Sequence, residues 1–521
     1  MINSFDYLDE PQLSFGLDQV TQDPRDGLSL FGPSDRRNSL PDHIVIGTEH
    51  GNALWRQWAA ALNAPAFCTD VRRHRAWPPY CGFDVAFGTR WPDPAKTFNL
   101  DPRVLKQCAF KADRYERAYS VANLYIEPLA QIQRLDAKPA LAICVVPDIV
   151  YENCRLKSSV SKSELSDMPK TKEERAFVKG ALRDKSSGQV RMFDDEVPEL
   201  KNTLENLQQY GLSPDFRRQL KARMMAFELP VQIVKESTLA ITAKVRNGEP
   251  GDNPLSDRLW NFATAVYYKC GFKPWKTPWA REGVCYVGLA YKKAEHNRTA
   301  CCAAQMFLDS GDGIVFVGEF GPWYSEERRE FHLPPTEAEK LLRGTIETYQ
   351  KQDGRQLKEI FLHARSGIDK AEYEGFLRAC PAGVKLIAIR VRQDRNGLRL
   401  FRYDAHPNVA KRGQHPVQRG IFWQRTRHYG LLFTTGFKPR IATYDGWEIP
   451  VPLSITAQHG EADMLQVARD ILGLTKLNYN ACSLGESQPI TVKYSDRVGE
   501  ILLANPELAR EHWRHNFKYY I

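Results

Sequence analysis

Short apolar runs alternate with longer amphipathic segments through the first half of the chain. One run, residues 43–47, ends at a glycine turn, and a second, residues 140–146, ends at Pro147-Asp148. Between them, residues 55–62 carry apolar side chains at helical spacing. Buried strands that alternate with helices are typical of a parallel α/β sheet. Further along, the pattern predicts a basic helix over 215–225, a strand over 230–234 and a helix over 256–269.

The pattern changes after residue 280. Three strands come first, at 283–289, 301–308 and 314–317, and the last two are joined by the turn residues 309–313. A capping box at Thr336 then opens a helix. A strand over 360–362, a helix over 369–380 and a strand over 386–389 follow. The order β-β-β-α-β-α-β is that of the ribonuclease H fold.

These patterns predict an α/β protein with a Rossmann-like domain followed by a ribonuclease H-like domain. Residues 1–34 carry turn chemistry and are expected to form an extended, loop-like lead-in. The first domain is expected over 35–280, with a polar, Lys- and Ser-rich surface insertion at about 155–197 and a helix from Pro198 to Gly211. The second is expected over 281–521.

Composition narrows the class of protein. The 521 residues are 42% hydrophobic and 26% charged, as in ordinary globular proteins. The excess of 72 − 63 = +9 positive charges permits a polyanionic partner. The sequence has no apolar run of membrane-spanning length, its start lacks a signal-peptide pattern, and its 11 cysteines form no CxxC pair, so a cytoplasmic protein with reduced thiols is expected. Common nucleotide-binding, zincin and hydrolase motifs are absent.

A ribonuclease H nuclease needs carboxylates at fixed positions to hold two divalent ions. Ala290 stands where the first strand would carry an acid, and Arg365-Ser366 stands where the fourth strand would deliver another. Three other acids, Glu319, Asp309 and Asp312, are interpreted as turn and surface residues. The sequence therefore predicts a nuclease fold without a nuclease site.

A second group of residues is basic. Arg217 and Lys221 are four residues apart, so they project from one helix face. Gln232 follows in the next strand and Lys269 ends the next helix, so the four could converge on a phosphate. A solvated helix face is the alternative. The apolar C-terminus is expected to dock, and the α-carboxylate of Ile521 could then hold Mg²⁺, although packing alone is the other interpretation.

Together these segments resemble a short prokaryotic Argonaute, which has MID and PIWI domains only. The resemblance implies that Arg217, Lys221, Gln232, Lys269 and Ile521 hold the 5′-phosphate of a guide, with Mg²⁺ at the Ile521 carboxylate. It also implies that Ala290, Arg365, Ser366 and Asn478 mark degenerate nuclease positions and that the chain itself is not an enzyme. The strings that carry the resemblance are residues 23–28, 31–33, 146–151, 217–222, 232–239, 268–271, 434–436, 450–453, 474–480 and 489–502.

The resemblance implies a guide-dependent sensor of a prokaryotic immune system. A guide RNA would pair with single-stranded invader DNA and activate an associated APAZ effector, a TIR or sirtuin-like NAD hydrolase, with oligomerisation of the active assembly a possibility. A target-cleaving nuclease and a scaffold that binds no guide remain the alternatives. Expected backbone contacts in a channel between MID and PIWI are Arg390, Arg392, Arg395, Lys411, Arg412, Arg425 and Arg427.

Overall fold

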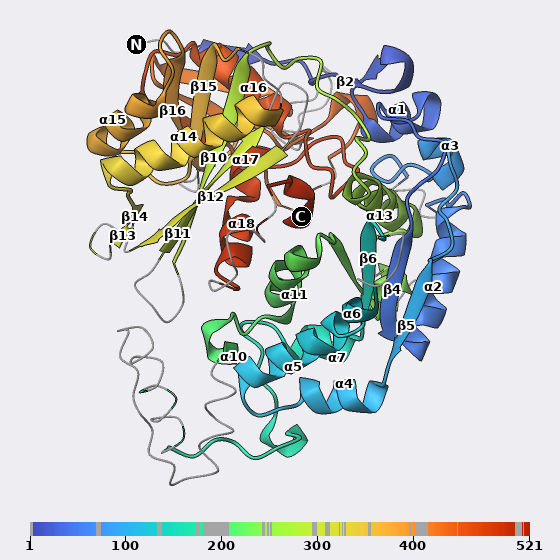
Figure 1. Cartoon of the computed structure of the whole chain (residues 1–521). Coiled ribbons are helices and arrows are strands. Elements are labelled where there is room, and N and C mark those ends of the chain that lie inside the picture. The colour runs from blue at the N-terminus through green and yellow to red at the C-terminus, as the bar shows by residue number, and fades with distance from the viewer. Residues whose placement is uncertain are drawn as a thin grey trace.

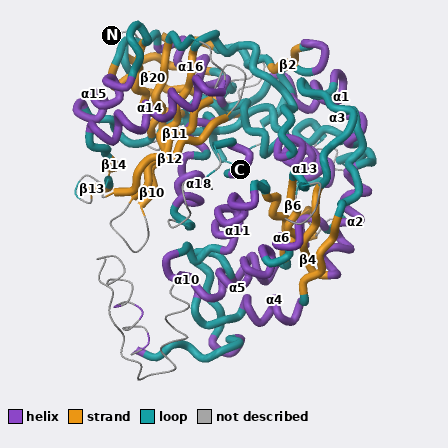
Figure 2. Tube along the Cα trace, in the orientation of Figure 1, coloured by secondary structure: helices purple, strands orange, loops and turns teal. Residues whose placement is uncertain are grey.

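The computed structural model contains two α/β halves, each built on its own sheet (Figures 1 and 2). It describes residues 4–521 except 69–73, 133–137, 173, 175–177, 179, 181–207, 242–244, 247–248, 251–252, 294–299, 308–312, 322, 326, 328–329, 353–355, 395–397, 403–414, 445, 447, 506–512 and 514.

The first half has a four-stranded parallel sheet in the order β5-β4-β6-β7. Every residue of β4 and β6 is buried, which matches their uninterrupted apolar sequence. The predicted Rossmann-like arrangement is confirmed. The strands are β4 (His43–Thr48), β5 (Lys96–Leu100), β6 (Leu141–Val146) and β7 (Val231–Lys235).

Helices pack around this sheet and begin at capped residues. Thr48 accepts a hydrogen bond from the Gly51 amide, so α2 begins at Glu49, earlier than the expected residue 55. Asp215 caps α11 in the same way. The helices of this half are α2 (Glu49–Leu62), α3 (Phe83–Phe87), α4 (Pro102–Ala109), α5 (Arg114–Ile126), α6 (Leu129–Ile132), α7 (Asp148–Asn153), α10 (Gln208–Gly211), α11 (Phe216–Met224), α12 (Glu236–Leu239) and α13 (Leu255–Lys269).

The second half contains a nine-stranded sheet in the order β1-β19-β20-β21-β16-β15-β10-β11-β12. Its last five strands have the ribonuclease H order: β10, β11 and β12 are antiparallel, and β15 and β16 extend the sheet in parallel from β10. The predicted fold is confirmed. The strands are β1 (Ser4–Tyr7), β10 (Val284–Lys293), β11 (Ala300–Phe307), β12 (Gly313–Gly321), β15 (Glu359–Ala364), β16 (Lys385–Gln393), β19 (Ile421–Thr426), β20 (Tyr429–Leu432) and β21 (Leu453–His459).

Helices cover both faces of this sheet. Alternate residues of β10 separate into two cores: Val287 packs in the cluster that contains Leu341 of α14, and Tyr286 packs in the cluster that contains Val498 of α18. The first face carries α14 (Pro335–Gln352) and α15 (Lys370–Ala379), and the second carries α16 (Met464–Leu474), α17 (Ile490–Lys493) and α18 (Ser495–Leu502).

The first 34 residues are more ordered than the sequence predicts. β1 pairs with β19 as the edge strand of the large sheet, and β2 (Leu13–Ser14) pairs with β3 (Val20–Thr21). Pro24–Phe31 forms helix α1, where a loop was expected. The sequence Asp23-Pro24 is the reason: Asp23 accepts from the Arg25 amide as N-cap, and proline suits the first helical turn.

The insertion at 155–197 is described only in part. Its first portion includes a short 3₁₀ helix at Lys162–Glu164, while most of the remainder and the helix expected from Pro198 lie outside the described residues. In the part of the chain that the structure describes, no helix is long and apolar enough to cross a membrane.

A buried ion cluster fastens the N-terminal segment to the second half. The Glu10 carboxylate accepts from Arg419 at 2.7 Å and from Lys476 at 2.8 Å. Both cations are almost completely buried, with side chains 1% and 0% exposed. Although burial raises the pKa of Glu10, the two cations outweigh it and lower the pKa to about 2.

We expect Glu10→Gln to lower the free energy of unfolding by about 3 kcal/mol, because it leaves two buried cations without their anion. The folded-state pKa lies below the ordinary value of 4.5, so this stability is present above that pH and is lost as the pH falls toward 2. Urea unfolding measures the loss. Asp9→Asn, at an exposed neighbour, is the matched control and should change stability little.

Candidate nucleic-acid interface

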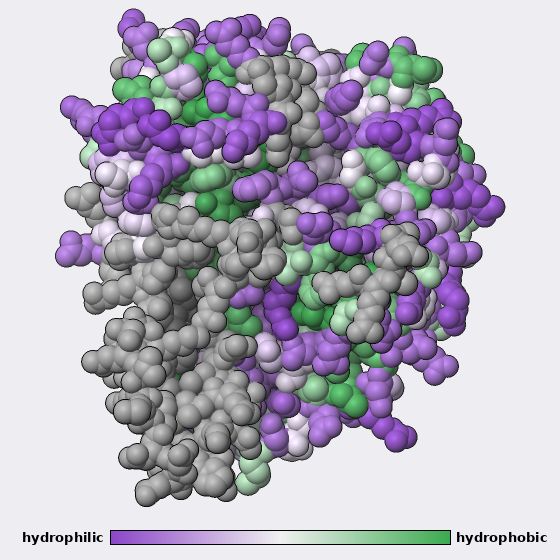
Figure 3. All heavy atoms as spheres, viewed as in Figure 1, coloured by the Kyte–Doolittle hydropathy of each residue, from purple (hydrophilic) through white to green (hydrophobic). Residues whose placement is uncertain are grey.

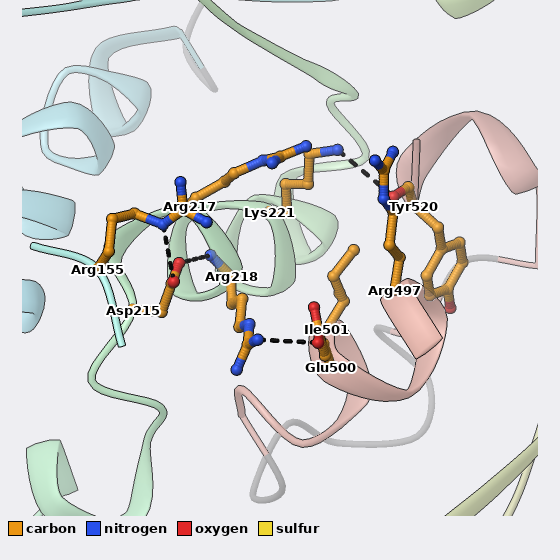
Figure 4. Close-up of a pocket in the computed structure, with 9 residues that line it drawn as sticks. All are labelled: Arg155, Asp215, Arg217, Arg218, Lys221, Arg497, Glu500, Ile501 and Tyr520. Atoms are coloured by element: carbon orange, nitrogen blue, oxygen red, sulfur yellow. Dashed lines mark hydrogen bonds and ion pairs between the residues drawn. The ribbon is translucent and has the colours of Figure 1, made fainter. Parts of the chain in front are cut away.

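The N-terminal part of α11 borders a pocket between the two halves. Arg217 and Lys221 project from it on one face, toward α18 (Figure 4). Asp215 accepts from the Arg218 amide at 3.1 Å and from Arg155 at 3.0 Å, which fixes the start of the helix. The expected placement of two cations at a capped helix start is therefore confirmed.

Lys221 lies at the floor of the pocket against the docked C-terminus, which is in the middle of the molecule (Figure 1). Its ammonium donates to the backbone oxygen of Ile521 at 2.6 Å, and Tyr520 offers a second oxygen at 3.4 Å. The residue is only 6% exposed. Burial, with added repulsion from Lys269 and Arg217, holds the pKa of Lys221 well below its ordinary value.

Lys269, at the end of α13, is buried beside β7. It donates to the side-chain oxygen of Gln232 at 2.6 Å and to the Val231 carbonyl at 3.0 Å. Burial and the charge of Arg217 lower the pKa of Lys269 to about 7. Gln232 thus orients the lysine, and the structure brings together all five residues that the sequence predicts for the phosphate site.

The pocket also contains two arginines that the sequence analysis did not single out. Arg497, on α18, comes from the second half, and its guanidinium lies over the Tyr494 ring at 5.0 Å from the centroid. Arg155 lies over the Tyr151 ring at 4.7 Å. Arg497 belongs to the string 489–502 that carries the family resemblance, and that was the available indication; Arg155 had none beyond its charge.

The arrangement favours an anion with more than one charge. Neither Arg217 nor Arg497 forms an ion pair or hydrogen bond within the described residues, whereas the acids Asp215 and Glu500 pair with Arg155 and Arg218. Hydrophilic side chains cover much of the coloured surface in Figure 3. The pocket encloses about 370 Å³ including its open mouth and is lined by Arg155, Asp215, Arg217, Arg218, Lys221, Arg497, Glu500, Ile501 and Tyr520.

The residues of the free pocket do not fit Mg²⁺. This ion prefers several oxygen ligands, many of them anionic. Here the oxygen of Ile521 already accepts from Lys221, the nearby charges are cations, and the lining acids are paired. Mg²⁺ at Ile521 therefore stays a prediction for a pocket that already contains phosphate oxygens.

The first two nuclease positions come together on neighbouring strands. Gly288 of β10 pairs with His363 of β15, so Ala290 and Arg365 lie at the same level, two residues further along. Ala290 is completely buried, and Ser366 follows Arg365 in the turn after β15. Here Arg365 forms an ion pair with Asp496 of α18, an acid that the sequence analysis overlooked.

Asn478 lies in a different cluster. Its side chain accepts from the Tyr494 hydroxyl at 2.6 Å and donates to Glu486, whose carboxylate also pairs with Lys493. Its contacts in the described part of the chain do not include Ala290 or Arg365.

The remaining acids give no described metal cluster. Across the described residues, no three His, Cys, Asp or Glu side chains lie in an arrangement that could hold a metal ion. Glu319 lies in β12 with its side chain undescribed, and Asp309 and Asp312 fall outside the described residues.

The expected channel arginines do not face the pocket. Arg390 and Arg392 continue the alternation of Leu386 and Ala388, which pack with α14 and α15, so they leave the sheet on the face opposite α18. Arg425, over the Trp423 ring at 5.0 Å, shares that face, and Arg427 is exposed in the following turn. The channel placement was wrong because strand alternation had not been applied. Arg395, Lys411 and Arg412 lie outside the described residues.

Solved structures with this fold are Argonaute and Piwi proteins. Clostridium butyricum Argonaute bound to a guide DNA and a 19-mer target DNA is similar, with a TM-score of 0.57, 14% identity and coverage of 97% of this chain and 54% of that one. Drosophila Piwi gives 0.57, 14%, 99% and 56%. A. aeolicus Argonaute gives 0.51, 14%, 96% and 53%.

The chain thus spans about half the length of the solved structures it matches. No protein-family model and no curated protein matches it. At this identity the likeness establishes the fold: an Argonaute/Piwi fold with MID-like and ribonuclease H-like PIWI parts.

The low pKa of Lys269 predicts that anion affinity falls with rising pH. A bound dianion raises this pKa, so binding takes up a proton above about pH 7. Affinity for a 5′-phosphorylated oligonucleotide, measured by fluorescence anisotropy, should fall roughly tenfold or more between pH 7 and 9. Lys269→Met should bind more weakly and with a flatter profile, whereas Lys276→Met, at an exposed lysine, should behave as wild type. Parallel profiles for wild type and Lys269→Met would contradict this assignment.

Proposed function

We propose that the protein binds a 5′-phosphorylated guide strand in this pocket and uses it to recognise a complementary strand. One observation carries the proposal: in an Argonaute/Piwi fold, four cations converge on one pocket, two of them without an ion pair among the described residues. A terminal phosphate supplies up to two negative charges and three acceptor oxygens, which suit these donors. The four are Arg217, Lys221, Lys269 and Arg497.

The depth of the pocket favours a strand end over an internal phosphate. Lys221 and Lys269 are nearly inaccessible, and the C-terminal residues Tyr520 and Ile521 close the floor behind them. A phosphodiester within a strand carries a nucleoside on each side and cannot reach so far. The Argonaute of Clostridium butyricum was solved with a guide DNA, whereas the short-Argonaute resemblance implies a guide RNA, so both are tested.

We further propose that the protein senses its target without cutting it. The support is the residue identity at the nuclease positions: Ala290 has no ligand atom, and Arg365 brings a cation where a metal ligand would be needed. A sensor of this kind needs an effector. The resemblance assigns that role to an APAZ-containing protein with TIR or sirtuin-like NAD hydrolase activity, which would deplete NAD when invader DNA is recognised.

The double variant Arg217→Ala/Lys221→Ala tests guide binding. Each lost charged hydrogen bond costs about 1.5–3 kcal/mol, so affinity for a 5′-phosphorylated guide should fall about 100-fold or more. Binding of the same strand with a 5′-hydroxyl should change much less. Titrations with RNA and DNA guides, each with Mg²⁺ and with EDTA, measure both.

Arg56→Ala, which removes an exposed arginine of α2, is the matched control. It should leave the affinity for the phosphorylated guide unchanged. Equal affinities of the double variant and wild type for that guide would favour a scaffold that binds no guide.

A cleavage assay tests the absence of nuclease activity. Protein loaded with a guide and given a matched labelled target should release no product with Mg²⁺ or Mn²⁺, because the metal ligands are missing. A known target-cleaving Argonaute serves as the positive control. Cleavage that Glu319→Gln abolishes would establish the nuclease alternative.

A further inference from the structure

The large sheet ends in an open edge at β1. This strand is outermost in the sheet order, with β19 on one side and no strand on the other among the described residues. Natural proteins protect such edges with lysine, proline, bulges or a covering element. β1 has neither lysine nor proline, and its single charged residue is Asp6. The edge is therefore available to another strand.

Apolar side chains surround this edge on one face. Phe5 and Tyr7 are 58% and 48% exposed, and they lie in register with Trp423 and Ile421 of β19. The rings of Phe5 and Trp423 stack at 5.1 Å, which holds the strand flat. We call these four residues the β1 patch. Its position beside an open edge is the combination that strand addition uses: backbone pairing for affinity and alternate side chains for specificity.

Unpaired positive charge adjoins the patch. Ser4, the first residue of the strand, lies opposite Gln424, so Arg425 and Arg427 of the β19–β20 hairpin lie just beyond that end. Both are exposed, and neither forms an ion pair within the described residues. An incoming segment with acidic residues at this end would complement them.

The geometry points to a polypeptide rather than a nucleic acid. The Trp423 ring is already covered by Phe5 and by Arg425, so it offers no free face to a base. Moreover, a nucleic acid cannot continue a β-ladder. We propose that β1 is the docking edge for an extended strand of a partner protein, apolar where it meets Phe5 and Tyr7 and acidic near Arg425. The site lies on the sheet face opposite α18 and does not depend on guide binding.

A photo-cross-linker in place of Phe5 tests the proposal. The full chain, with p-benzoylphenylalanine at position 5, is irradiated in its native host, and cross-linked peptides are identified by mass spectrometry. The same probe at exposed Leu30 is the control. We expect one partner protein, cross-linked from position 5 alone, through a segment that alternates apolar residues and carries acids at one end.

The partner is then purified with the chain for two quantitative measurements. Phe5→Lys/Tyr7→Lys should weaken the complex about tenfold or more, with guide affinity and melting temperature unchanged, because both side chains are exposed. The amides of β1 should gain hydrogen-exchange protection in the complex. Cross-links to a second copy of the chain, to nucleic acid, or to nothing would overturn the proposal, as would a complex that the double variant leaves intact.

Discussion

The pocket depends on keeping like charges close together in a place with little water. Arg217, Lys221, Lys269 and Arg497 repel one another, and burial disfavours each charge, as the lowered pKa values of the two lysines reflect. What offsets this cost in the free protein is a few backbone and amide oxygens, such as that of Ile521. The site therefore resembles a loaded spring for an anion: binding adds the missing negative charge to positions that folding has already fixed.

Such a site requires the two halves to hold one relative position, because α11 and α13 come from the first and α18 from the second. A common apolar core supplies that rigidity. At its centre, Trp275 donates to the Lys476 carbonyl at 3.1 Å, and Tyr479 donates to the Trp275 carbonyl at 3.0 Å. Large aromatic residues packed across the boundary resist sliding. Phosphate binding and sheet packing are consequently parts of one construction.

The sequence was informative where structure is local and weak where it is not. Strands such as β6 and the ribonuclease H order follow from apolar runs and turn residues, and Arg217 with Lys221 follows from helical spacing. Arg497 joins them across nearly the whole chain, which no local pattern encodes. The same limit explains Asp496, which reaches Arg365 only because α18 packs beside β15.

The pairing of β1 with β19 has a consequence for the order of folding. Ser4 and Gln424 are partners across 420 positions of sequence. At a synthesis rate of about 5–20 residues per second, the early strand must wait roughly 20–80 s for its neighbour to leave the ribosome. During that time its aromatic side chains have no sheet to join. The large sheet is thus completed only near the end of translation, and until then the nascent chain depends on the first half, whose strands and helices lie within one continuous stretch.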